Sequence, residues 1–505
     1  MAEVERLKNR KAPIDMDSEE FRRLGHRLVD QVAELLDTLR NCPVTPGESP
    51  AIVRQALRAD RSLADDGMDA GMLMEGTTNL LKVHSLFNGH PRFWGYITSS
   101  AAPVGILGEM LAAAVNANVG AWTLSPMASE IEAQTVRWIS EFIGYRKDCG
   151  GLLVSGGNMA NFICFLAART SQAEWEVRQT GLNGKQAKQL RVYATRETHT
   201  WIMKAADLFG LGTDSIQWIE TDKKQRMVPE SLRQRIETDR ARGEQPMLVV
   251  GTAGSVSTGT VDLLDELASV CHESEVWFHV DGAYGGFAAH APGAPEELRG
   301  LSKADSVAVD PHKWLYAPLE AGCALVRDAD ALRKTFAYHP PYYHFGEETT
   351  NYVDLGMQNS RGFRALKVWL ALQQVGRAAY LDMIGDDIAL SKELARSLLQ
   401  HPELELITQE LSTATFRYIP LDLLAARGKQ DVEKYLNELN TEILKRIEKS
   451  GEAFLSNAVV DNKFVLRACI VNFRTTLEDV QALPAIVLRL GREADRELRP
   501  QKLHQ

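Results

Sequence analysis

The sequence lacks closely spaced cysteines, a long uninterrupted apolar run and an excess of basic residues. Its six cysteines include no C-x-x-C pair, which argues against a zinc site or a disulfide framework and favours free thiols in a reducing compartment. The most apolar long stretch, Ala102 to Leu124, is interrupted by Glu109, Asn116 and Asn118, so it is a poor candidate for a membrane span. The net charge of -10 argues against nucleic-acid binding, which depends on lysine and arginine contacts to phosphate.

The N-terminus also lacks the basic and then apolar layout of a secretion signal. Together these absences predict a cytoplasmic protein with no membrane or nucleic-acid partner. The composition itself is ordinary for a globular protein, with 45% hydrophobic and 25% charged residues. A chain of 505 residues is long enough for two or three domains with a substantial core.

The N-terminal region predicts an amphipathic helix with few neighbours of its own. Apolar residues recur every three or four positions from Asp17 to Leu39, and Ser18 is available as an N-cap. A proline-rich connector follows, so the apolar stripe must pack elsewhere, either on its own domain or on a second subunit. We assign residues 1–100 to an N-terminal helical segment that is exchanged between the subunits of a dimer.

From Gly151 onward strands alternate with helices, which predicts parallel βα units in one mostly parallel sheet. After about residue 375, long amphipathic helices mix with strand-like pieces instead. We therefore predict an α/β large domain over residues 101–375 and a small C-terminal α/β domain over residues 376–505. The expected strands of the large domain are Leu152–Val154, Arg191–Ala194, Ser215–Trp218, Met247–Val250, Val276–Val280, Ser306–Val309 and Gly322–Val326.

Chemically useful groups recur where these strands end, which is the edge where ligands bind in open α/β sheets. Gly156 and Gly157 follow the first strand and open a helix, whose free backbone N–H groups suit a phosphate. Asp281 ends a buried strand, where a carboxylate is costly unless it is paired. Lys313 follows another strand, and a partly desolvated lysine there can attack a carbonyl carbon.

Each of these signals has a structural alternative when it is taken alone. Gly-Gly turns before helices are common, a strand-end aspartate can cap a helix or bind a metal, and most lysines near strand ends are solvated. Together, however, they form the combination that pyridoxal phosphate requires. The glycine turn would bind the phosphate, Lys313 the aldehyde, and Asp281 the protonated ring nitrogen.

On these residues the chain resembles the group II pyridoxal-phosphate-dependent amino-acid decarboxylases, and within them the aromatic-L-amino-acid decarboxylases. The resemblance implies an aspartate-aminotransferase-like fold (PLP fold type I), pyridoxal 5'-phosphate as the cofactor, no metal, and a homodimer. It also implies decarboxylation of an aromatic L-amino acid, such as tryptophan, tyrosine, DOPA or phenylalanine, to the amine and CO2. The motifs that carry it are Ser125–Glu132 (SPMASEIE), Ser155–Asn161 (SGGNMAN), His279–Gly286 (HVDGAYGG) and Asp310–Leu315 (DPHKWL).

The resemblance also implies which residues hold the cofactor. Lys313 looks like the lysine that binds the aldehyde, and Asp281 like the partner of the ring nitrogen. Ala283 would touch the ring, and His199 would stack on its other face. The remaining predicted contacts, most of them to the phosphate, are Gly156, Gly157, Asn158, Thr252 and His312.

The resemblance also implies which residues contact the substrate and which residue transfers a proton. Trp94 and Tyr96 favour a flat aromatic ring, and Ser360 stands where some members have glycine, which can widen preference toward imidazole substrates. Tyr342 resembles a loop tyrosine that returns a proton to the substrate Cα, although the adjacent Tyr343 is an alternative.

Other functions remain open at this stage. They are decarboxylation of histidine or of an acidic or sulfinic amino acid, an aromatic aldehyde synthase, and a non-catalytic scaffold of the same fold. Tyr342 argues against the synthase, which is associated with phenylalanine at that loop position. Asp310 departs from the family pattern, because several aromatic decarboxylases have asparagine there.

Overall fold

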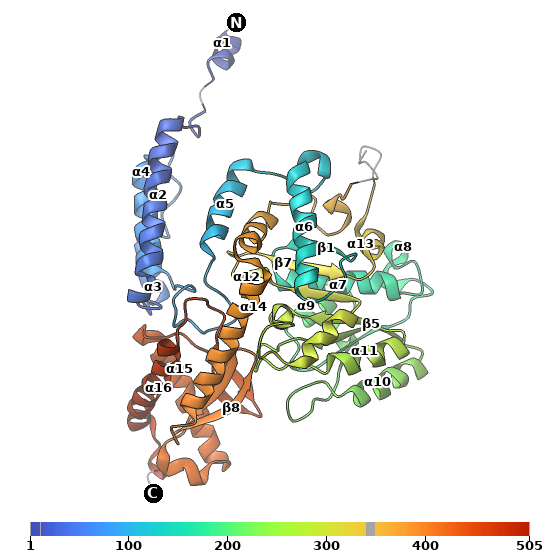
Figure 1. The fold of residues 1–505 in the computed structure, drawn as a ribbon, viewed down its shortest axis with the longest axis vertical. Helices are drawn as coiled ribbons and strands as arrows, with labels where there is room; N and C mark the ends of the chain where they lie inside the picture. Colours follow the sequence, from blue (N-terminus) through green and yellow to red (C-terminus); the bar gives the residue numbers. More distant parts are fainter. Residues whose placement is uncertain (1, 11, 340–348, 504–505) are drawn as a thin grey trace.

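The computed structural model describes residues 2–10, 12–339 and 349–503. The large domain is built on a seven-stranded sheet in the order β1-β7-β6-β5-β4-β2-β3. Figure 1 labels β1, β7 and β5 of this sheet. Its strands are β1 (Gly150–Val154), β2 (Leu190–Ala194), β3 (Ile216–Trp218), β4 (Gln245–Thr252), β5 (Trp277–Asp281), β6 (Ser306–Val309) and β7 (Gly322–Val326). Each expected strand is present, with bounds that differ from the prediction by no more than a few residues.

The sheet is mostly parallel, and β7 is where it departs from the expected βα pattern. β7 runs antiparallel to both β1 and β6, whereas the other neighbouring strands are parallel. A parallel connection needs a crossover, usually a helix of several turns, but only α12 (Pro311–Trp314) lies between β6 and β7. Because β7 reverses direction between them, β1 points the same way as β6, and their carboxyl ends meet at one edge.

Helices cover both faces of this sheet, and a hydrophobic core fills the space on each side. Because both faces are covered, nearly every residue of the central strands β4 and β5 is buried, on both faces of each strand. One face is covered by α7 (Gly157–Gln172), α9 (Trp201–Leu208) and α13 (Ala329–Phe336), and the other by α6 (Pro126–Phe142), α10 (Pro229–Ala241) and α11 (Leu264–Glu273).

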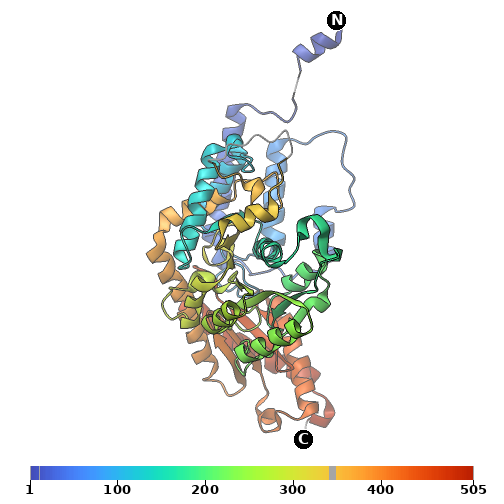
Figure 2. The same ribbon diagram turned by 90° about the vertical axis from the view of Figure 1, so that its right-hand side faces the viewer.

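The small domain has an antiparallel four-stranded sheet in the order β10-β11-β9-β8. Its strands are β8 (Leu404–Glu410), β9 (Thr413–Tyr418), β10 (Ser456–Val460) and β11 (Lys463–Cys469), packed against α15 (Gln430–Ser450) and α16 (Leu477–Leu498). Helix α14 (Ala365–Leu398) links the two domains and leaves helical geometry at Gly376, where φ is 75°. Figure 2 shows the small domain at the end of the molecule opposite α1 (Ala2–Lys8).

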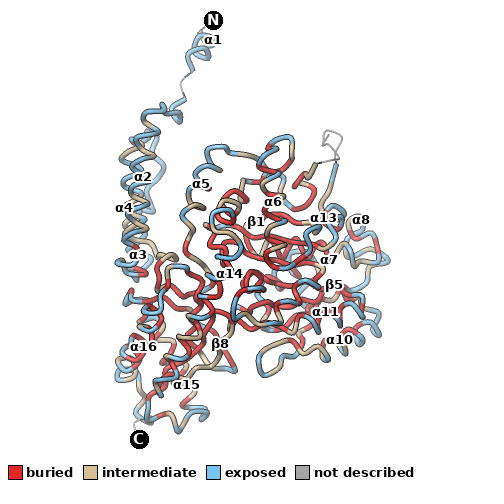
Figure 3. Tube along the Cα trace, in the orientation of Figure 1, coloured by how far each residue is buried: buried red, intermediate tan, exposed pale blue. Residues whose placement is uncertain are grey.

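The N-terminal helices form an elongated arm. We use this name for α2 (Ser18–Thr38), α3 (Pro50–Leu57) and α4 (Ala70–His84). Ion pairs from Arg27 to Glu75 (3.0 Å) and from Lys82 to Glu34 (2.9 Å) hold α2 and α4 side by side, running in the same direction. None of the three helices, all of which lie in the described part of the chain, contains a buried residue, as the pale arm in Figure 3 shows.

One local prediction in this region needs correction. Asp17, and not Ser18, caps α2, because its side chain accepts a hydrogen bond from the backbone N–H of Glu20 at 2.8 Å. The apolar stretch after Ala102 forms α5 (Pro103–Val115), which ends at Asn116 in the left-handed conformation. Among the described helices, none combines the length and the apolar character that crossing a bilayer requires.

Candidate active site

A cavity of about 320 Å³ opens at the edge of the large sheet where β1, β2, β4, β5 and β6 end. Because these strands point the same way, the residues that follow them gather there. The structure brings all of the predicted cofactor residues to this cavity: Gly156, Gly157, Asn158, His199, Thr252, Asp281, Ala283, His312 and Lys313.

Lys313 lies one short turn beyond β6, because Pro311 ends the strand and begins α12. Its Nζ is 3.1 Å from Oδ2 of Asp310, and its side chain is 17% exposed. The second oxygen of Asp310 is buried and has no hydrogen-bond partner among the described residues. The lysine amine is therefore held beside a buried carboxylate while it still reaches the cavity, as a group that binds an aldehyde must.

Asp281 occupies the last position of β5 and is buried. Its Oδ2 accepts a hydrogen bond from the indole Nε1 of Trp201 at 2.8 Å, and its Oδ1 accepts one from the backbone N–H of Ala283 at 3.2 Å. Each carboxylate oxygen can accept a second bond. This buried anion is therefore suited to a protonated ring nitrogen.

The glycine turn lies between β1 and α7. Gly156 has φ 138°, which glycine adopts readily, and a Cβ at Gly157 would lie 2.8 Å from Oδ2 of Asp310. Gly157 and Asn158 form the first turn of α7, where backbone N–H groups have no partner within the helix. Thr252 also lines the cavity, and its Oγ1 is buried and has no hydrogen-bond partner within the part of the chain that the structure describes. These donors fit a phosphorylated cofactor.

The histidines of the site are shifted toward their neutral forms. Burial lowers the pKa of His199, and the nearby Asp281 carboxylate only partly offsets that effect. Burial likewise lowers the pKa of His312, whose ring lies 3.7 Å from Asp310. A neutral His199 can cover an aromatic ring without adding positive charge beside Lys313.

Several lining residues were missed by the sequence analysis. Asn161 belongs to the motif Ser155–Asn161, and Glu197 lies two positions before His199, so the same strand-end rule could have identified them. Ile97, Val256 and Tyr284 gave no such signal, because apolar and aromatic residues near a turn are usually core.

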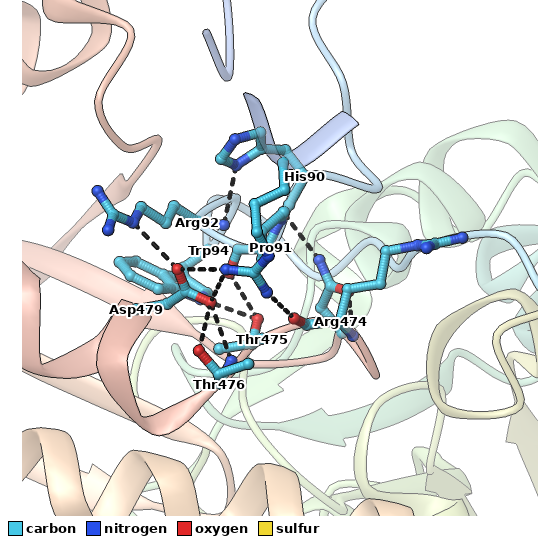
Figure 4. Close-up of polar contacts among 10 residues, drawn as sticks. His90, Pro91, Arg92, Trp94, Arg474, Thr475, Thr476 and Asp479 are labelled. Atoms are coloured by element: carbon cyan, nitrogen blue, oxygen red, sulfur yellow. Dashed lines mark hydrogen bonds and ion pairs between the residues drawn. The ribbon is translucent and has the colours of Figure 1, made fainter. Parts of the chain in front are cut away.

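The predicted substrate contact at Trp94 is wrong for this pocket. Trp94 is fully buried in the core of the small domain, and its backbone N–H donates to the carbonyl oxygen of Phe454 at 2.8 Å. Figure 4 shows its surroundings, where Thr475 donates to the carbonyl oxygen of Pro91 at 2.7 Å and Arg92 pairs with Asp479 at 3.1 Å. The segment around Trp94 therefore anchors the N-terminal region to the small domain.

Of the three other predicted residues, two do not line the cavity and one lies outside the residues that the structure describes. Tyr96 is 64% exposed, and its ring is tilted against Phe454 with centroids 6.3 Å apart. Ser360 is also exposed, on the loop before the buried Arg361. Neither lines the cavity within the described residues. Tyr342 and its alternative Tyr343 lie outside the described residues.

Comparisons with known proteins agree with this chemistry. Residues 53–419 match the family described as "Pyridoxal-dependent decarboxylase conserved domain". The chain is 32% identical over 485 residues to the aromatic-L-amino-acid decarboxylase of Bacillus atrophaeus, covering 95% of this chain and 97% of that protein. It is also 29% identical to tyrosine decarboxylase 3 of Petroselinum crispum, covering 92% of this chain and 91% of the relative.

Solved structures agree as well. The crystal structure of Oryza sativa TDC with PLP and tryptamine superposes with a TM-score of 0.87 at 25% identity, covering 96% of this chain and 99% of that one. The expected PLP fold type I is therefore confirmed. With the family match over most of the chain, these findings show that this protein belongs to the pyridoxal-dependent decarboxylases, the carboxy-lyases that act on amino acids with pyridoxal phosphate as cofactor.

Proposed function

We propose that this protein decarboxylates an aromatic L-amino acid to the corresponding amine and CO2. The observation that carries the proposal is the cavity in which Lys313, Asp281 and the glycine turn converge. The names of the relatives support the aromatic substrate class, because they include an aromatic-L-amino-acid decarboxylase and a tyrosine decarboxylase. When bound, pyridoxal phosphate supplies a carbonyl that condenses with amines and a ring that accepts the electron pair left by CO2.

Residues of the chain would bind the cofactor, orient it and exclude water from it. The Nζ of Lys313 would bind the aldehyde carbon of the cofactor, and the carboxylate of Asp281 would keep a proton on the ring nitrogen. The first turn of α7 would bind the phosphate through its N–H groups, and the Thr252 hydroxyl, which is in register with Asp281, would be a further donor to the cofactor. The ring of His199 covers the cofactor and excludes water on that side.

The lining of the cavity favours an uncharged side chain over an acidic one. Ile97 and Val256 provide apolar surface for a ring. Glu197 adds a carboxylate, one oxygen of which is buried without a hydrogen-bond partner among the described residues. Burial raises the pKa of Glu197, and the Ser257 hydroxyl lowers it only in part. A carboxylate or sulfinate on the substrate side chain would bring a second acidic group beside Glu197, whose charged form burial already disfavours.

The test is an assay of CO2 release by the purified, cofactor-loaded protein across tryptophan, tyrosine, DOPA, phenylalanine, histidine, glutamate and cysteine sulfinate. We expect turnover of aromatic substrates only, with one amine formed per CO2. Preferred turnover of histidine, glutamate or cysteine sulfinate would overturn the aromatic assignment. An aldehyde product with release of ammonia would instead identify the oxidative synthase.

The assembly state and location are further parts of the proposal. We propose a homodimer, in which a second copy covers the apolar residues that the arm exposes, such as Phe21, Leu73 and Leu81. We also propose a cytoplasmic location, which the six free cysteines support because they suit a reducing compartment. Size measurement in solution and fractionation of the source cells would test these two statements separately.

A further inference from the structure

Trp201 is a buried residue of the active site to which the mechanism above gives no role. It begins α9, two positions after His199, and its side chain is fully buried. It lies behind the lining of the cavity, on the face of the sheet covered by α7 and α9. Its two N–H groups nevertheless point to Asp281 and His199, two of the side chains that are predicted to contact the cofactor ring.

The first contact is to Asp281. The indole Nε1 donates to Oδ2 of this carboxylate at 2.8 Å, a bond in which the acceptor carries the charge. Because the backbone N–H of Ala283 already binds Oδ1, the two donors together fix the plane of the carboxylate. Because Asp281 lines the cavity, the lone pairs that remain are available to a ligand there.

The second contact is to His199. The backbone N–H of Trp201 donates to Nδ1 of this imidazole at 3.3 Å. Nδ1 is therefore an acceptor, and the proton of the neutral ring lies on Nε2. One residue thus sets the orientation of Asp281 and the tautomer of His199.

The indole ring is itself held firmly. It meets the ring of His279 edge to face, with centroids 5.7 Å apart and an interplanar angle of 89°, and it meets Phe165 in the same way at 6.5 Å. His279 is fixed in turn by Asn161 at Nε2 (2.7 Å) and by Ser306 at Nδ1 (2.9 Å). Rings locked in this way cannot turn the indole N–H away from Asp281 without disturbing the core.

We propose that Trp201 is a positioning residue for the decarboxylation, which orients the Asp281 carboxylate toward the ring nitrogen of the cofactor and stabilises its negative charge. Without the indole donor, the proton shared between Asp281 and the ring nitrogen would move toward the carboxylate. The ring would then carry less positive charge and would accept an electron pair less readily. The proposal rests on the decarboxylase function proposed above.

The variant Trp201→Phe keeps an aromatic ring and the backbone N–H but removes the indole N–H. We expect kcat to fall roughly tenfold to a hundredfold, the scale of one hydrogen bond to a charged group, with a smaller change in KM. We also expect the pH midpoint of the absorbance change of the bound cofactor to rise by about one unit. A ring with less positive charge lets the nitrogen of Lys313 hold its proton to a higher pH.

The matched control is Trp175→Phe. Trp175 is another buried indole, but its Nε1 donates to the carbonyl oxygen of Gly181 at 2.9 Å, outside the cavity. We expect this variant to keep the wild-type midpoint. If Trp201→Phe does not fold, 3-benzothienylalanine at position 201 preserves the shape of the indole and replaces its N–H with sulfur.

The spectroscopic measurement separates this proposal from the proposed function. A cofactor-loaded variant that lacks the donor but keeps the wild-type pH midpoint would overturn the role of Trp201, whichever substrate is turned over. A shifted midpoint in a protein that decarboxylates none of the tested amino acids would uphold the role of Trp201 in orienting Asp281 toward the cofactor and would remove the proposed function instead.

Discussion

The active-site cavity and the N-terminal arm differ in what covers them, although the strands and helices that form both were predicted from apolar patterns in the sequence. At the cavity, strands and helices of the same chain bury Asp281, His279 and Trp201. In the arm, α2 repeats apolar residues at helical spacing, yet no residue of α2, α3 or α4 is buried. A periodic pattern therefore predicts that a helix has an apolar face, but not which molecule covers it.

The largest expected effect is at Lys313, where a substitution should abolish the activity and leave the arm unchanged. Replacing Lys313 with alanine removes the amine that binds the cofactor aldehyde, so we expect decarboxylation to fall by more than about a thousandfold. The arm is distant from this change, so the oligomeric state should stay that of the wild type. Assays of CO2 release and light scattering on the same sample check both statements. Substantial remaining turnover would exclude Lys313 as the catalytic amine.

The converse change places charge on the arm. We expect the double variant Phe21→Asp with Leu81→Asp to raise the dissociation constant of the dimer roughly a hundredfold or more, because two unpaired carboxylates would be buried at the interface. Sedimentation or light scattering over a dilution series measures this constant.

Leu63→Asp is the control for the arm variant. Leu63 is 99% exposed in the connection between α3 and α4, so the same type of change there should leave the dimer intact. A double variant that dimerises as tightly as the wild type would show that Phe21 and Leu81 are not at the subunit interface.

The sequence predicted the cavity far better than the surroundings of the substrate. Glycine, aspartate and lysine at strand ends carry local signals, because backbone conformation and buried charge constrain those positions strongly. Parallel strands then bring these positions to one edge, so the predicted cofactor residues are found in one cavity. Their catalytic roles stay predictions until they are tested.

Trp94 shows why the rest could not be predicted. An aromatic residue beside glycine and proline fits a binding loop and a core equally well, and the choice depends on a partner far away in sequence. That partner is the small domain, where Cys469 donates its backbone N–H to the carbonyl oxygen of Trp94 at 2.9 Å. For the same reason, no local pattern indicated that the indole of Trp201 would reach Asp281.

A smaller effect, on the stability of the folded chain around the cavity, should emerge in acid. His279 is buried beside the cavity, and burial lowers its pKa from 6.5 to about 4. Between these values the unfolded chain binds the proton and the folded chain does not, so stability is lost as the pH falls through this window. The loss is about 2 kcal/mol at pH 5.

The variant His279→Gln tests this pH dependence. Glutamine can still donate to Asn161 and accept from Ser306, but it does not titrate in this range. We therefore expect thermal unfolding of the variant to depend less on pH between 6.5 and 5 than that of the wild type. Equal slopes in the two proteins would assign the acid sensitivity to other groups.

The smallest expected effect concerns substrate choice at Glu197. Glu197→Gln keeps the size of the side chain and removes its charge, which should relieve repulsion of an acidic substrate. We expect kcat/KM for glutamate or cysteine sulfinate, relative to that for the preferred aromatic substrate, to rise about threefold to tenfold. Glu266→Gln, which removes the same charge from an exposed position on α11, should leave this ratio unchanged. If both variants keep the wild-type ratio, the substrate side chain does not approach Glu197, and the apolar residues Ile97 and Val256 alone would set the preference.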